Sequence, residues 1–174
     1  MSIENIAPGV IISLIMALLY AASKKKPKDA GDGSFILQLP KFYAWFGLFV
    51  TLGGFALVIY TFMYARESDR AIAAVSSFIA LLTGMFLFAK GYISQIKVTD
   101  SGLLETTLFG KEKTILWGEV TKISFGTISL ELTIRSADKK IKAHQHMVGF
   151  DDLVYKLESK TRKSRFDMGI PGII

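Results

Sequence analysis

The sequence predicts a membrane protein with a membrane α-helical region of three transmembrane helices and a small all-β barrel domain closed by one C-terminal helix. Two apolar segments, residues 42–65 and 71–93, each exceed the roughly 20 residues that a helix needs to cross a bilayer core. A shorter apolar segment precedes them at residues 6–22. From residue 94 onward the hydrophobic period changes from helical to two, which is typical of strands.

The two long segments predict a transmembrane helical hairpin at residues 42–93. The first segment contains no Asp, Glu, Lys or Arg, and the second contains only Lys90, near its end. A helix that is apolar on all sides belongs in a large protein core or in a membrane. We favour the membrane because the rest of the chain is too small to cover two such helices.

The segment at residues 6–22 predicts a first transmembrane helix within residues 1–23. Its 17 residues are at the short limit for a span. A cleaved signal peptide is the alternative, but such peptides carry positive charge before the apolar run. Here Glu4 precedes the run and the lysines follow it, which favours a retained helix.

Positive charge predicts how the chain is oriented. Residues 24–41 form an expected basic linker, whose last apolar part at residues 35–40 could lie along the membrane interface, and cytoplasmic loops are enriched in Lys and Arg. This places the N-terminus outside and the linker and C-terminal domain in the cytoplasm, in a multi-pass protein of the cytoplasmic (inner) membrane. The linker lysines are also candidates for contact with anionic headgroups; they are Lys24, Lys25, Lys26 and Lys28.

Composition limits the function classes. The net charge of +6 arises partly between apolar segments, so it indicates membrane orientation and lipid as a partner and gives no reason to expect nucleic acid. The absence of cysteine excludes disulfides and thiolate chemistry. The predicted spans carry no acidic residue or histidine, which weakens a transporter or pump hypothesis.

Small residues predict how the helices pack. Small side chains let helix backbones approach closely in lipid. The expected packing positions are Gly47, Thr51 and Gly54 on the first long helix and Ser76, Ala80 and Gly84 on the second. Packing within the chain is the favoured interpretation, and self-association through the same stripe is the alternative.

Residues 94–165 predict a cytoplasmic domain of short antiparallel strands. Strands are expected at 95–99, 103–109, 114–117, 120–125, 130–134 and 140–148, separated by turn residues. At residues 150–157 the apolar positions fall on one helical face. This helix is expected to cap the open end of a small barrel.

The domain resembles the bacterial pleckstrin-homology-like (PH-like) domains. The resemblance is carried by residues 98–103, 108–111 and 115–123 and by the closing helix at 150–157. It implies a partly open barrel of about seven strands with one C-terminal helix, often preceded by an apolar helical hairpin. It also implies binding or assembly roles and supplies no catalytic residue.

Three polar side chains are candidates for a reactive site, and structural roles are expected for them. His144 and His146 would share a strand face and could share a metal, but no third ligand is evident, so solvent-facing histidines are expected. Glu119 could act as a general acid, but a strand-end carboxylate is favoured. No cofactor is expected, and no set of residues converges on a reaction, so the sequence predicts a non-enzymatic protein.

The C-terminal end offers a basic cluster and an apolar tail. The basic residues are candidates for membrane-surface contact; they are Lys160, Arg162, Lys163 and Arg165. A helix end frayed into solvent is the alternative. The tail at residues 166–174 could dock on the domain, the membrane or a partner.

These observations favour a membrane protein whose PH-like domain binds a protein partner or organises a homo-oligomer. The first alternative is a domain that senses anionic lipid. The second is a small transporter or immunity-type membrane protein whose helices carry the function.

Overall fold

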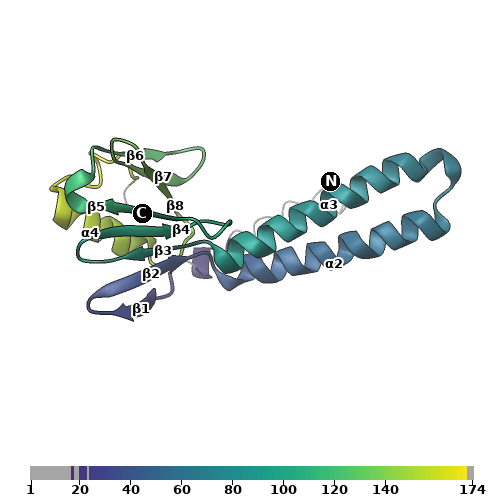
Figure 1. Ribbon diagram of the computed structural model, residues 1–174, viewed down its shortest axis with the longest axis horizontal. Helices are drawn as coiled ribbons and strands as arrows, with labels where there is room; N and C mark the ends of the chain where they lie inside the picture. Colours follow the sequence, from purple (N-terminus) through teal and green to yellow (C-terminus); the bar gives the residue numbers. More distant parts are fainter. Residues whose placement is uncertain (1–16, 18–19, 23, 172–174) are drawn as a thin grey trace, which may run out of the picture. The chain divides into compact units, whose positions relative to one another are not determined.

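The computed structural model describes residues 17, 20–22 and 24–171, which form two compact units (Figure 1). One unit is the helical segment Lys41–Ser94. The other combines the chain before Lys41 with the chain from Gln95 onward. The expected first helix at residues 6–22 lies largely outside the described residues.

The helical unit is an antiparallel hairpin of α2 (Lys41–Tyr64) and α3 (Glu67–Ile93). The turn is shorter than predicted because α3 begins at Glu67, where Glu67 and Asp69 place negative charge in the first helical turn. Acidic side chains there are favoured by the helix dipole.

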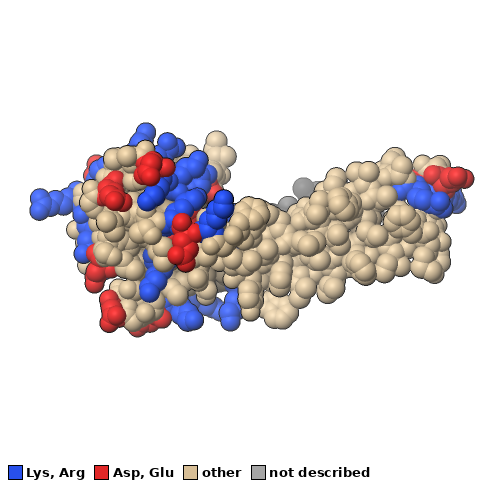
Figure 2. All heavy atoms as spheres, in the orientation of Figure 1, with Lys and Arg blue, Asp and Glu red and all other residues tan. Residues whose placement is uncertain are grey.

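The hairpin has the length and surface of a membrane-spanning pair. Both helices are long and apolar enough to cross a membrane, and most of their apolar side chains are exposed, as for Trp45, Phe49 and Ile72. A core helix of a soluble protein would bury these side chains. On the face drawn in Figure 2, charged residues gather on the β domain and at the α2–α3 turn, while the flanks of the helices are uncharged.

The second unit contains eight antiparallel strands in two sheets. The five-stranded sheet has the order β1 (Lys28–Gly31), β2 (Ser34–Gln38), β3 (Gln95–Val98), β4 (Gly102–Thr106) and β5 (Glu112–Leu116). A 3₁₀ turn, η1 (Trp117–Glu119), leads to the three-stranded sheet of β6 (Lys122–Gly126), β7 (Glu131–Arg135) and β8 (Lys140–His144). The chain continues into helix α4 (Phe150–Thr161).

The expected linker at 24–41 is corrected by this topology, because most of it is folded into the domain. β2 pairs with β3 over four residues, from Phe35↔Val98 to Gln38↔Gln95. Leu37 is fully buried and Leu39 nearly so. The domain is therefore discontinuous: the helical hairpin is inserted between two paired strands, and residues 94–165 alone are not the complete domain.

The expected barrel, closed at one end by the C-terminal helix, is also corrected. Among residues 24–171 the strands form two sheets that meet through an isolated antiparallel bridge between Gln38 and Val148. The 3₁₀ turn η1 separates β5 from β6, so these consecutive strands belong to different sheets.

The expected C-terminal helix is confirmed, and it completes the core. All four apolar positions on its predicted face are buried, at Phe150, Leu153, Val154 and Leu157. They join strand residues that are fully buried, among them Leu37, Ile96, Leu103, Ile115, Leu132, Ile134 and Ile141. Burying one such side chain contributes about 1.5–3 kcal/mol relative to exposure.

The apolar tail docks on the domain over the part that the structure describes. Met168 and Ile170 are buried, and the carbonyl of Met168 accepts a hydrogen bond of 3.0 Å from the N–H of Phe125 in β6. Residues 172–174 lie outside the described residues.

Candidate functional site

The contact between α2 and α3 is built on glycine. A Cβ atom added at Gly54 would lie 2.7 Å from the backbone N of Leu81, and one at Gly91 would lie 2.7 Å from the N of Ala44. Cβ atoms added at Gly47 and Gly84 would lie even closer to the facing helix, at Phe88 and Thr51 respectively. The two backbones touch along this line, which is the packing that small residues permit in lipid.

Polar side chains extend the same seam toward the turn. Thr61 and Ser77 are both buried, and their hydroxyl oxygens lie 3.4 Å apart across the two helices. Each hydroxyl also donates to its own helix, Thr61 to the carbonyl of Leu57 and Ser77 to that of Ala73. The hydroxyl groups are therefore satisfied without water.

The seam follows a seven-residue period on each helix. On α2 the small residues are Gly47, Gly54 and Thr61, and on α3 they are Ser77, Gly84 and Gly91. Five of the six packing positions predicted from the sequence lie at this contact; they are Gly47, Thr51, Gly54, Ala80 and Gly84. The sixth, Ser76, is exposed, because its neighbour Ser77 occupies the seam.

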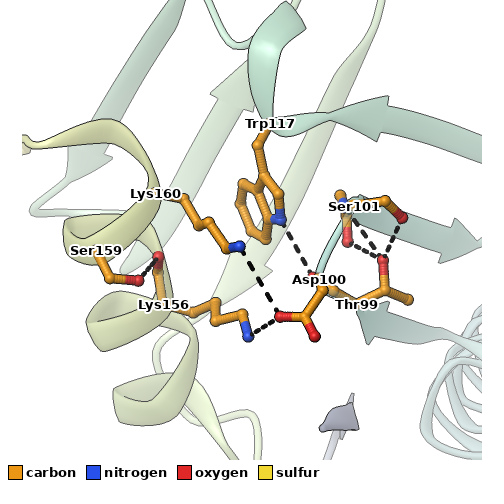
Figure 3. A network of polar contacts seen from close by, with 8 residues as sticks. Thr99, Asp100, Ser101, Trp117, Lys156, Ser159 and Lys160 are labelled. Atoms are coloured by element: carbon orange, nitrogen blue, oxygen red, sulfur yellow. Dashed lines mark hydrogen bonds and ion pairs between the residues drawn. The ribbon is translucent and has the colours of Figure 1, made fainter. Parts of the chain in front are cut away.

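A polar network ties the β3–β4 turn to α4 (Figure 3). The indole N–H of Trp117 donates to the carbonyl of Thr99 at 3.1 Å. Asp100 lies 2.6 Å from the Nζ of Lys156 and 3.9 Å from that of Lys160. The hydrogen bond and charge of Lys156, with the charge of Lys160, hold the pKa of Asp100 below its usual value.

Asp151 joins two distant segments at the start of α4. One carboxylate oxygen lies 3.0 Å from the Nζ of Lys24, and the other lies 2.8 Å from a guanidinium nitrogen of Arg165. Desolvation acts to raise the pKa of Asp151, but the hydrogen bonds and charges of Lys24 and Arg165 outweigh it and lower the pKa. The carboxylate therefore stays charged and fastens the segments at Lys24 and Arg165 to α4.

These pairs divide the basic residues selected from the sequence into two groups. Three of them form ion pairs within the domain: Lys24, Lys160 and Arg165. The others are exposed and make no ion pair within the described residues; they are Lys25, Lys26, Lys28, Arg162 and Lys163. The sequence could not separate the groups, because the acidic partners are far away in the chain.

The two histidines lie close together, but they are not both solvent-facing strand residues. β8 ends at His144, and His146 is buried in the loop that follows. Their rings are 5.2 Å apart, and the Nδ1 of His144 accepts from the backbone N–H of His146 at 3.2 Å. Neither ring nitrogen of His146 has a hydrogen-bond partner among the described residues, and burial lowers its pKa.

Glu119, the remaining candidate from the sequence, has a structural role. A carboxylate oxygen of Glu119 accepts from the backbone N–H of Leu116 at 3.1 Å, which secures η1. Over residues 24–171, no group of three or more His, Cys, Asp or Glu side chains is placed to hold a metal. An apolar hollow of about 370 Å³ lies on the hairpin, lined by Val58, Phe62, Ala74, Val75, Phe78 and Ile79.

No protein-family model, curated protein or solved structure matches this chain.

Proposed function

We propose that this chain is a non-enzymatic membrane protein that holds a PH-like domain at the cytoplasmic surface for protein binding or self-assembly. The supporting observation is the way the hairpin interrupts the sheet. Only Leu39 and Pro40 separate β2 from α2, and only Ser94 separates α3 from β3. If both helices span the bilayer, such short connections keep this end of the sheet at the membrane surface.

The same observation supports the proposed orientation. β2 and β3 pair directly, so the chain before α2 and the chain after α3 share one side of the membrane. The exposed lysines near Lys24 favour the cytoplasm as that side under the positive-inside rule. With residues 6–22 as a further span, the N-terminus lies outside.

The PH-like assignment of the domain is part of this proposal. Antiparallel strands followed by one amphipathic helix support it, because this is the order that the resemblance implies. Domains of that kind bind or assemble through their surfaces. In this domain, the ion pairs of Asp100 and Asp151 connect segments of the fold to α4.

The proposal is tested by the mass of the complex that the full chain forms in lipid nanodiscs made directly from the membrane. We expect a defined multimer or a stoichiometric protein partner. The control is the domain with the helices 41–94 replaced by a Gly/Ser linker, which reports association that does not need the hairpin. A full-length monomer without a protein partner would contradict the assembly proposal.

A second candidate, the binding of anionic lipid, is favoured by the exposed lysines. Lys25, Lys26 and Lys28 carry charge that no described acidic side chain neutralises, and each such residue near an anionic surface contributes about 1 kcal/mol. Neutralising these three residues should weaken binding of the linker-joined domain to phosphatidylglycerol vesicles and reduce its salt dependence. Binding that is unchanged by salt and by these substitutions would exclude this candidate.

A further inference from the structure

Two hairpin loops of the β domain each present a strongly exposed apolar side chain. Phe109 lies in the β4–β5 loop and is 85% exposed, and Ile128 lies in the β6–β7 loop and is 99% exposed. Exposure of a single apolar residue is common on protein surfaces. Their shared location in the fold is what requires an explanation.

The strand register places the Phe109 loop at the end of the sheet where the helices are attached. Gln38 pairs with Gln95, and Gln95 pairs in turn with Thr106. Thr106 pairs with Glu112, and the loop between them carries Phe109. The chain leaves this same row of residues for α2 and returns to it from α3.

The second sheet brings the Ile128 loop to the same end. The last pairs of its strands are Gly126↔Glu131 and Glu131↔His144. The chain then passes from His144 to Val148, which forms the bridge to Gln38. Figure 1 shows the β4–β5 and β6–β7 loops at the end of the domain where β2 stops and β3 starts.

The opposite end of the domain has a different character. Its connections include the polar turns at 99–101 and 136–139, in which Thr99, Ser101, Ser136 and Asp138 hydrogen-bond within the turn. Its exposed apolar residue, Leu116, is 45% exposed. Tyr155 and Phe166 are also exposed, but they belong to α4 and the segment after it.

Basic residues accompany the apolar tip of the first loop. Lys111 is exposed beside Phe109, and Lys113 follows at the start of β5, 3.5 Å from Glu105. An aromatic side chain next to lysine is the composition of surfaces that lie in the membrane interface, with the ring among acyl chains and the charge among headgroups.

We propose that Phe109 and Ile128 insert into the cytoplasmic interface of the bilayer and fix the orientation of the β domain on the membrane. The inference rests on the proposed membrane anchoring by α2 and α3. Together with the two helix attachments, the loops give the domain four contacts along one end. The partner is the lipid surface itself, recognised by apolar insertion.

The experiment uses the absence of cysteine from the chain. Single-cysteine variants Phe109→Cys and Ile128→Cys of the full-length protein are spin-labelled in nanodiscs of phosphatidylcholine and phosphatidylglycerol. Collision with oxygen and with a water-soluble nickel chelate gives the depth of each label. Leu116→Cys, at the opposite end of the sheet, is the matched control, and Phe49→Cys on α2 reports whether the hairpin is in lipid.

We expect both loop labels to lie about 5–10 Å deep in the boundary between headgroups and acyl chains. The label at Leu116→Cys should lie in water, and the label at Phe49→Cys should lie in the hydrocarbon. A water-exposed signal at either loop label, with Phe49→Cys in lipid, would overturn the insertion while leaving the anchoring intact. A water-exposed Phe49→Cys label would instead overturn the anchoring. Loop labels shielded only in discs that hold two chains would assign the surface to contact between copies and overturn the lipid proposal.

Discussion

Gln38 and Gln95 are paired neighbours in one sheet, although the whole helical hairpin lies between them in the chain. The next two pairs, Leu37↔Ile96 and Ile36↔Lys97, continue the ladder away from the helices. The pairing of β2 with β3 therefore holds the two ends of the hairpin next to each other. The hairpin in turn connects two strands that are neighbours in the sheet.

Replacing the hairpin should leave a folded domain. Joining Pro40 to Gln95 through a short Gly/Ser linker keeps every strand pair of the five-stranded sheet. We expect this variant to be soluble and to unfold in one cooperative thermal transition followed by circular dichroism.

The matched comparison is the segment 94–174, which lacks β1 and β2. It exposes the edge of β3 and loses Leu37 from the core, so we expect aggregation or no cooperative transition. In the linker-joined variant, Leu37→Ala should lower the free energy of unfolding by about 2–5 kcal/mol. A segment 94–174 that unfolds as cooperatively as the joined variant would contradict the discontinuous domain.

Alanine substitutions at the neighbouring glycines Gly53 and Gly54 distinguish the effect of helix–helix packing on stability from the effect of helix propensity. A methyl group at Gly54 would press on the backbone of Leu81, whereas one at Gly53 meets no atom within 4 Å. Gly54→Ala should destabilise the hairpin by about 1–3 kcal/mol through overpacking. Unfolding of the protein in lipid discs, followed by helical circular dichroism, measures the change.

Gly53→Ala is the control for the same chemical change on the same turn of α2. It removes a flexible glycine from a helix, which favours the helix by up to about 1 kcal/mol. Equal destabilisation by the two variants would show that the glycine seam is not the contact between α2 and α3.

The sequence predicted the elements whose signal is local. The long apolar segments of α2 and α3 and the apolar face of α4 at Phe150, Leu153, Val154 and Leu157 are visible in one window of residues. A pattern of this kind depends on neighbours three or four positions apart, so it survives without knowledge of the fold.

The prediction failed where pairing crosses the hairpin. The expected linker at residues 24–41 is wrong at residues 35–38, because their partner strand begins only at Gln95, after the whole hairpin. The turn at Gly31–Ser34, with Asp32 at a φ of 52°, is itself a hairpin turn. The continuous apolar run Phe35–Leu37, which directly follows this turn, was the signal that could have identified β2.

The pairing of the candidate site residues could not be predicted for the same reason. The carboxylate of Asp151 forms ion pairs with Arg165 and with Lys24, and Lys24 comes from a distant segment of the chain. Ser76 and Ser77 are equivalent by composition, and the choice between them depends on the rotation of α3 against α2. Neither fact is encoded in local sequence.

Asp151→Asn should loosen both ends of the domain at neutral pH. The substitution removes the charge from two ion pairs whose members are partly exposed, with side-chain exposures of 41%, 47% and 21%. Screening by solvent limits the loss in the free energy of unfolding to about 1 kcal/mol. Chemical unfolding of the linker-joined domain measures it.

The effect has a defined pH window and a control. Because the pKa of Asp151 is lowered in the fold, the stabilisation is present above its unfolded pKa of about 4 and is lost as pH falls through the folded value. Asp152→Asn changes the adjacent carboxylate in the same helical turn and should cost less. A larger loss from Asp152→Asn would contradict the role of the Asp151 pairs.

His146 should make the domain sensitive to mild acid. Its ring is buried and both nitrogens lack a hydrogen-bond partner among the described residues, so burial holds its pKa below the ordinary value. Protonation then favours the unfolded chain. The stability is complete above the unfolded pKa of about 6.5 and declines as pH falls through the folded value.

The unfolding temperature of the linker-joined domain between pH 7.5 and 5.0 tests this prediction, above the range in which Asp151 titrates. We expect a fall toward acid in the native sequence and a flatter profile in His146→Leu, because leucine has no proton to gain. His144→Gln keeps the buried ring and should retain the fall. A native profile that is flat across this range, or one that only His144→Gln flattens, would show that His146 is not the group that protonates on unfolding.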